Sequence, residues 1–206
     1  MARPRPTVLI VDDDGATRAG LAVLVENWGY QPIEAADGKS AVKICNDELP
    51  RAIVTDLMMP GMHTIGRPVE TFIQFAGLIY GGVPEQFPKL RIAFLECGVG
   101  WVPYWMERMD EEWEKRGKIE APRCKKKPSD YVKSGNLFFA LEPEEETVPY
   151  VIERIGADKI LFASDYPHWD GIFPHVVSTI LGRKDISDDA KTQILGQNAK
   201  RFYGWQ

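Results

Sequence analysis

Four apolar runs in this chain each end in an acidic residue. They are residues 8–11 before Asp12, 52–55 before Asp56, 92–95 before Glu96 and 160–164 before Asp165. Segments with apolar residues at helical spacing separate them, so the sequence predicts alternating strands and helices. Strands joined by helices pair in parallel, and their carboxyl ends then meet at one edge. We therefore expect an α/β fold with a parallel sheet of about six strands, with these acids along one edge.

The segment 161–170 holds the strongest candidates for chemistry. Asp165 follows the apolar run, Pro167 stops the strand, and His168 and Asp170 come just beyond. In α/β sheets and barrels, reactions take place outside the carboxyl ends of the strands. A carboxylate at this position is placed to hold a metal ion or to move a proton. The alternative is an aspartate that caps the next helix, which is the usual role of an isolated one.

Residues 7–61 read as strand, helix, strand, helix and strand. Asp12 and Asp13 follow the first strand, and Asp56 ends the third. This order and these acids resemble the N-terminal half of the response-regulator receiver domain, a flavodoxin-like, doubly wound fold. The resemblance implies that Asp12, Asp13 and Asp56 bind magnesium. It also implies that Asp56 accepts a phosphoryl group from a histidine kinase.

Ordered motifs recur over residues 66–205. They include Gly66-Arg67-Pro68-Val69-Glu70-Thr71, Phe94-Leu95-Glu96-Cys97-Gly98-Val99-Gly100-Trp101 and Ala163-Ser164-Asp165-Tyr166-Pro167-His168. They resemble the C-terminal half of the amidohydrolase-related (amidohydrolase 2) metal-dependent hydrolases and decarboxylases, which are (β/α)8 TIM barrels. The resemblance implies zinc or manganese as the metal, and a small carboxylate or amide as substrate. It also implies that Asp165 binds the metal or transfers a proton.

Both resemblances are incomplete at their sites. A receiver carries a hydroxyl residue and a Lys-Pro pair after its later strands, but here Glu142-Pro143 follows the corresponding run. The barrel family places a His-x-His or Glu-x-His motif and a further histidine on strands that this chain lacks. Glu96 replaces a histidine that many members carry, and His168 matches a residue that orients rather than binds.

The two resemblances meet between residues 59 and 66. We therefore expect a receiver-like βαβαβ half over residues 1–62 and an amidohydrolase-like half-barrel over residues 63–206. Both parents repeat right-handed βα units, so one hybrid sheet is physically plausible. Recombination, natural or engineered, explains such a chain better than divergence does. Within the second half we expect a helix over 102–115, a loop over 116–134, a helix opening at 144–150 and a helix over 172–181.

The composition fits a folded protein without a nucleic-acid partner. The 206 residues are 44% hydrophobic with a net charge of −5, a sign that disfavours nucleic acid. Cys45, Cys97 and Cys124 lack metal-site spacing, so we expect reduced thiols in a cytoplasm. The N-terminus lacks a signal-peptide pattern, and no apolar stretch approaches the roughly 20 residues of a membrane span. Oligomerisation stays open.

Three functions are consistent with these patterns. The first is a metal-dependent hydrolase or carboxy-lyase centred on Asp165, weakly active or inactive because its ligand set is incomplete. The second is a phosphorelay module using Asp56, and the third is an inert folded hybrid. In a single sheet the strand-end acids would share a rim, and oxygen ligands favour magnesium, manganese or calcium. His63 and His175 do not fall on family metal positions.

Overall fold

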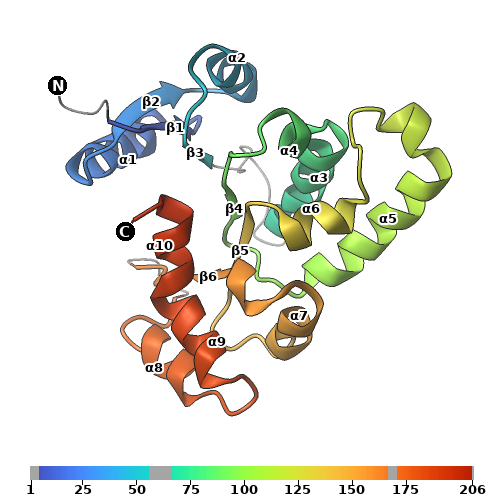
Figure 1. Cartoon of the computed structure of the whole chain (residues 1–206). Helices are drawn as coiled ribbons and strands as arrows, with labels where there is room; N and C mark the ends of the chain where they lie inside the picture. Colours follow the sequence, from blue (N-terminus) through green and yellow to red (C-terminus); the bar gives the residue numbers. More distant parts are fainter. Residues whose placement is uncertain (1–4, 56–65, 167–170, 206) are drawn as a thin grey trace.

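The computed structural model describes residues 5–55, 66–166 and 171–205 of the chain. In this part, two three-stranded parallel sheets have the orders β2-β1-β3 and β4-β5-β6 (Figure 1). The strands are β1 Thr7–Val11, β2 Gln31–Ala35, β3 Ala52–Thr55, β4 Ile92–Phe94, β5 Leu137–Leu141 and β6 Ile160–Phe162. The predicted α/β class with parallel strands is therefore confirmed, but the described strands form two sheets and not the single sheet of about six strands that we expected.

The two sheets meet at a single isolated parallel bridge between Ala52 and Arg91. β4, β5 and β6 are neighbours in chain order, as consecutive strands are in a barrel. In the first sheet β1 lies between β2 and β3, which is the order of a doubly wound sheet rather than of a barrel. All the pairings are parallel, so the carboxyl ends of the strands point the same way.

The first sheet has a helix on each face, because successive strand residues point to opposite sides. α1 (Gly15–Asn27) packs on the face formed by Val8 and Ile10, and α2 (Gly38–Glu48) packs on the face formed by Leu9 and Val11. Both helices begin at an aspartate whose side chain accepts a backbone N–H bond. These bonds are Thr17 N to Asp14 at 2.7 Å and Ser40 N to Asp37 at 2.8 Å. Such caps fix where each helix starts.

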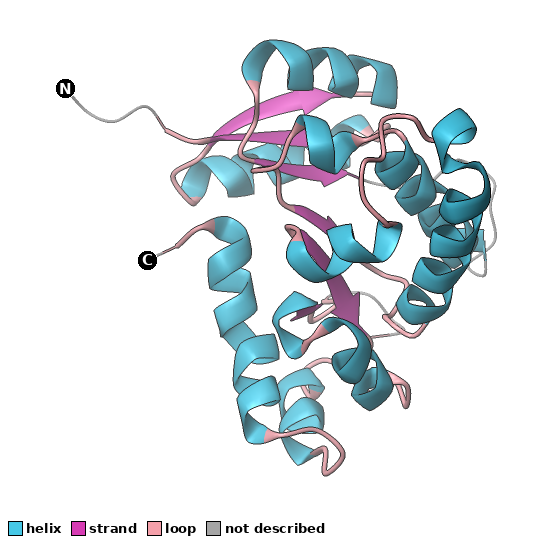
Figure 2. Ribbon diagram, turned by 45° about the vertical axis from the view of Figure 1, so that its right-hand side comes forward, coloured by secondary structure: helices cyan, strands magenta, loops and turns pink. Residues whose placement is uncertain are grey.

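The second sheet carries the main core, and Figure 2 shows helices gathered around that sheet. Phe75 of α3 (Gly66–Tyr80) lies within 5.2 to 5.9 Å, between ring centroids, of Phe94, Trp101 and Phe139. Trp101 opens α5 (Trp101–Glu120), and α7 (Val148–Ile155) adds further apolar residues to the same cluster. On the opposite face of the sheet, Phe138 packs edge-on against Phe202 of the C-terminal helix.

The C-terminal segment packs on the second sheet, and its last helix also contacts the first half of the chain. Its elements are α8 Val176–Gly182, α9 Asp188–Thr192, a π-helical turn Gln193–Gln197 and α10 Asn198–Tyr203. The buried Asn198 side chain donates to the carbonyl oxygens of Ala157 and Ile160, both at 2.7 Å. At the far end of α10, the Tyr30 hydroxyl donates to the Tyr203 carbonyl at 2.8 Å. α10 therefore links β6 to the first half of the chain.

Several predicted boundaries are wrong. Residues 116–134 are not a loop: α5 continues to Glu120, and α6 spans Pro128–Ser134. Gly117 does not break α5, because it is buried against the Trp113 ring and the Arg116–Glu120 ion pair spans it. The helix predicted to open at 144–150 begins only at Val148, and the helix predicted over 172–181 begins at Val176, beyond Pro174.

Two short elements complete the described chain: α4 Val83–Gln86 and the 3-10 turn Ala157–Lys159. Among the described residues, no helix is both long enough and apolar enough to cross a membrane.

Candidate functional site

Asp12 lies at the carboxyl end of β1 and is buried. Its Oδ1 accepts a bond from the Asp14 backbone N–H at 2.8 Å, and its carbonyl oxygen accepts one from Arg18 at 2.6 Å. Arg18 in turn pairs with Glu34 of β2 at 3.3 Å. Asp13 is exposed. The Asp12 side chain therefore organises the turn between β1 and α1 whether or not it also meets a cation.

Glu96 and Asp165 follow β4 and β6, on either side of β5. Both have left-handed backbones, with φ of 61° for Glu96 and 55° for Asp165. In the described chain only Leu49 shares this feature among non-glycine residues. Such conformations are uncommon and gather at functional sites. Gly171 lies so close that an added Cβ would sit 3.2 Å from the Asp165 Cβ.

Glu145 is a structural carboxylate of this edge that the sequence reasoning missed. It lies in the loop after β5, and its Oε1 accepts bonds from the backbone N–H of Val99 at 3.1 Å and of Gly100 at 2.6 Å. It also accepts the Thr147 hydroxyl at 2.9 Å. These donors precede α5, whose N-cap Gly100 offers no side-chain cap. Glu145 thereby caps α5 from another loop and fixes the turn that carries Glu96.

Two glycines in the turn before α5 leave room for the Glu145 carboxylate. A Cβ on Gly98 would lie 3.0 Å from a Glu145 oxygen, and one on Gly100 would lie 2.5 Å from the Thr147 hydroxyl. Gly98 also has a left-handed φ of 63°, which glycine adopts without strain. The run Gly98-Val99-Gly100 was the sequence signal that could have pointed to such a close contact.

Cys97 is not placed to act as a nucleophile. Burial raises the pKa of its thiol to about 11, although hydrogen bonds with Thr71 and Trp101 oppose the shift. The reactive species of cysteine is the thiolate, so at neutral pH this side chain is a protonated, half-buried packing group. Burial likewise raises the pKa of Cys124 to about 11.

The described residues do not provide a complete metal centre. Within residues 5–55, 66–166 and 171–205, no three His, Cys, Asp or Glu side chains are grouped so as to hold an ion. The candidates Asp56, His63, His168 and Asp170 lie outside the described residues. His175 is exposed and precedes α8. The described residues therefore supply at most part of the ligand set that the barrel resemblance implies.

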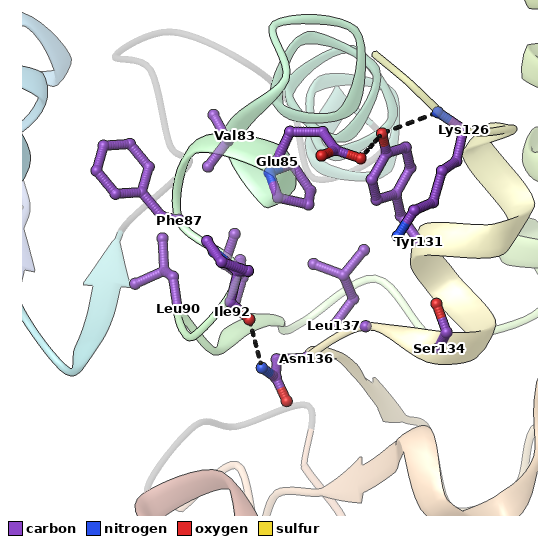
Figure 3. Close-up of a pocket in the computed structure, with 13 residues that line it drawn as sticks. Val83, Glu85, Phe87, Leu90, Ile92, Lys126, Tyr131, Ser134, Asn136 and Leu137 are labelled. Carbon is purple, nitrogen blue, oxygen red and sulfur yellow. Dashed lines mark hydrogen bonds between the residues drawn. The ribbon is translucent and has the colours of Figure 1, made fainter. Parts of the chain in front are cut away.

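A cavity of about 170 Å³ lies at the opposite, amino ends of β4 and β5 (Figure 3). Its apolar wall includes Ile92 and Leu137. The buried Tyr131 hydroxyl donates to Glu85 at 2.7 Å and accepts the backbone N–H of Lys126 at 3.1 Å. This network stabilises the turn before α6 and shares no residue with the strand-end carboxylates.

The comparisons with known proteins identify the family. The sequence profile described as amidohydrolase matches residues 31–205. The chain therefore belongs to the amidohydrolase family, as the motifs over 66–205 predicted, and the match extends back to the start of β2.

The individual relatives are distant. The chain is 28% identical over 143 residues to the 2-amino-3-carboxymuconate-6-semialdehyde decarboxylase of Dictyostelium discoideum, covering 68% of this chain and 38% of the relative. A dihydroxybenzoic acid decarboxylase from Polaromonas, solved with bound manganese, superposes with a TM-score of 0.62. That pair is 18% identical over 95% of this chain and 78% of the neighbour, which establishes similarity of fold alone.

A second kind of relative matches a shorter stretch. The probable transcriptional regulator ycf27 of Porphyridium aerugineum is 39% identical over 59 residues, covering 29% of this chain and 25% of the regulator. The chain thus spans well under half the length of both curated relatives.

Proposed function

We propose that this chain is an amidohydrolase-family hydrolase or decarboxylase portion with little or no turnover of its own, which binds a divalent cation weakly through Asp165 and Glu96. The observation that carries the proposal is the matched placement of these two acids. Each follows a strand of the β4-β5-β6 sheet and each has a strained, left-handed backbone.

The chemistry of the two groups defines the ligand. Carboxylate oxygens favour magnesium, manganese or calcium over zinc when no histidine takes part. A manganese-containing decarboxylase of similar fold makes Mn²⁺ the first choice, with a small aromatic carboxylate as the substrate class. Asp165 would hold the cation or carry a proton. Affinity and turnover are expected to be low because two acids alone do not preorganise a bound water.

The test is a Mn²⁺ titration followed by calorimetry and thermal melting. Asp165→Asn should reduce the rise in Tm strongly, and Glu96→Gln should reduce it by less. Asp47→Asn, on the exposed face of α2, is the matched control and should leave the rise unchanged. An equal rise in the parent and in Asp165→Asn would contradict the proposed site.

A turnover assay completes this test. Release of CO2 from 2,6-dihydroxybenzoate should proceed no faster with the parent chain than with Asp165→Asn. Release by the parent that is faster and is lost in Asp165→Asn would show an active decarboxylase instead.

The second candidate function is a phosphoacceptor using Asp56. Its support is the order β2-β1-β3, which in doubly wound sheets brings a ligand crevice to the ends of β1 and β3. Asp12 follows β1 and Asp56 follows β3 in sequence. Asp56 could be slowly modified by acetyl phosphate, but with Glu142 in the lysine position no receiver-type switch is expected. A conformational change on beryllium fluoride addition, seen by NMR, would contradict that expectation.

The hybrid organisation is part of the same proposal. The single bridge between β3 and β4 and the separate core clusters of the two sheets support a junction near residue 62. Size-exclusion chromatography with thermal melting tests it. Two melting transitions would indicate independent halves, and one cooperative transition would indicate a merged core. Absence of any cation effect in the parent chain would leave the inert hybrid as the better account.

A further inference from the structure

A small cavity of about 60 Å³ lies where the two sheets meet, at the amino ends of their strands. Arg51 directly precedes β3, and Arg91 forms the bridge to Ala52 beside β4. Tyr30 and Tyr203 close the other side of the cavity. This position is at the opposite edge from Glu96 and Asp165, so the cavity is separate from the proposed cation site.

The cavity carries positive charge without a negative partner. None of its lining residues is acidic, and no ion pair joins Arg51 or Arg91 to a carboxylate in the described part of the chain. Both arginines line this cavity, and burial, together with the charge of Arg51, lowers the pKa of Arg91. Like charges held close together are costly unless an opposite charge compensates them.

Arg91 is held in place by backbone rather than by an acid. Its Nη1 donates to the Arg201 carbonyl oxygen at 2.6 Å. Gly204 has a left-handed φ of 72°, and a Cβ there would lie 3.0 Å from the Arg91 Nη2. The Nε is buried and has no hydrogen-bond partner. The guanidinium is thus fixed beside the cavity with part of its donor capacity unused.

We propose that Arg51 and Arg91 bind a small oxyanion, of the size and charge of inorganic phosphate, in this cavity. A guanidinium presents N–H donors in a planar fork that matches phosphate and carboxylate oxygens. Two forks from neighbouring strands would neutralise a doubly charged anion. The cavity volume of about 60 Å³ suits one such group rather than a large ligand.

The bound anion would connect the two parts of the molecule. Arg51 belongs to the start of β3, whereas Arg91 contacts the end of α10 through Arg201 and Gly204. An anion that contacts both arginines binds only when β3, β4 and α10 are assembled. It therefore stabilises the assembled state by mass action.

The experiment measures Tm and calorimetric binding with sodium phosphate from 0 to roughly 10 mM, against sodium chloride at matched ionic strength. Phosphate also stabilises proteins by exclusion from their surface, so the variants decide the result. Arg51→Gln removes an exposed side chain and should weaken phosphate binding at least tenfold. Arg116→Gln removes the same charge from the exposed face of α5 and should leave binding unchanged.

Two further measurements identify the source of the anion and test a second, more conservative variant. Phenyl phosphate that binds as tightly as inorganic phosphate would show that the site takes the phosphate group of a larger molecule, and weaker binding would show preference for the free ion. Arg91→Lys keeps the charge but not the fork and should weaken binding. An equal phosphate effect in the parent and in Arg51→Gln, or an equal effect of chloride, would overturn the proposal.

Discussion

Replacing Glu145 tests whether one carboxylate holds the turn after β4. Glu145→Ala removes the acceptor for the backbone N–H groups of Val99 and Gly100 and for the Thr147 hydroxyl. The two N–H groups stand at the start of α5, a helix that runs from Trp101 to Glu120 without a side-chain cap of its own. They would lose a charged acceptor where the helix dipole favours negative charge.

The size of the effect follows from these bonds. A hydrogen bond to a charged group contributes about 1.5–3 kcal/mol to stability, and a lost helix cap typically costs about 1 kcal/mol. Glu145 is half-buried, so water will replace part of what is lost. We expect Glu145→Ala to lower the free energy of unfolding by about 2–4 kcal/mol. For a chain of this length that corresponds to a Tm lower by roughly 5–15 °C.

Urea denaturation and thermal melting measure this loss. Glu144→Ala and Glu146→Ala are matched controls, because both neighbours are exposed acids of the same loop. Each should change the free energy of unfolding by less than about 0.5 kcal/mol. Glu145→Gln should fall between the parent and Glu145→Ala, since an amide oxygen still accepts but carries no charge. If Glu145→Ala behaves like the two controls, the capping role assigned to this carboxylate is wrong.

Two further outcomes can be measured on the same chain. Asn198→Ala should lower the free energy of unfolding by about 2–3 kcal/mol, because it leaves the carbonyl oxygens of Ala157 and Ile160 without their donor. Urea denaturation measures this loss, and a loss under about 0.5 kcal/mol would contradict the expectation. Burial raises the pKa of the Cys97 thiol from its ordinary value of 9.0 to about 11 in the folded state, so only the unfolded state loses its proton between these values. Stability should therefore fall as pH rises from 9 to 11, less steeply in Cys97→Ala, and an unchanged slope in that variant would refute the assignment.

The sequence predicted the order of strands and helices because each strand is a short apolar run with a clear end. The acids Asp12, Glu96 and Asp165 do follow strands, and the family match confirms the amidohydrolase resemblance. The ends of the helices were harder to predict from the sequence. Charged residues around Gly117 resembled a loop, yet the i,i+4 pair of Arg116 with Glu120 and the contact with Trp113 continue the helix.

Contacts between distant segments could not be read from the chain. Glu145 lies 45 residues from Gly100, and nothing in its acidic surroundings distinguishes it from its neighbours. Arg51 and Arg91 are likewise ordinary charges in sequence and become a pair only when β3 meets β4. Such sites form only when distant segments assemble, so no local sequence pattern predicts them.

The geometry of the sheets also limits what the strand-end acids can do together. β1 and β4 are separated by β3, so their ends lie roughly 10 Å apart, and β1 and β6 lie roughly 19 Å apart at the usual strand spacing. Oxygen ligands of one cation lie about 2.3–2.6 Å from it, so an extended sheet would keep Asp12 and Asp165 too far apart to share an ion. We therefore expect two separate cation positions in place of the common rim predicted from the sequence. If each binds, the losses of the Mn²⁺-induced Tm rise in Asp12→Asn and in Asp165→Asn should add in the double variant. A double variant that loses no more than Asp165→Asn alone would show that the Asp12 position binds no cation.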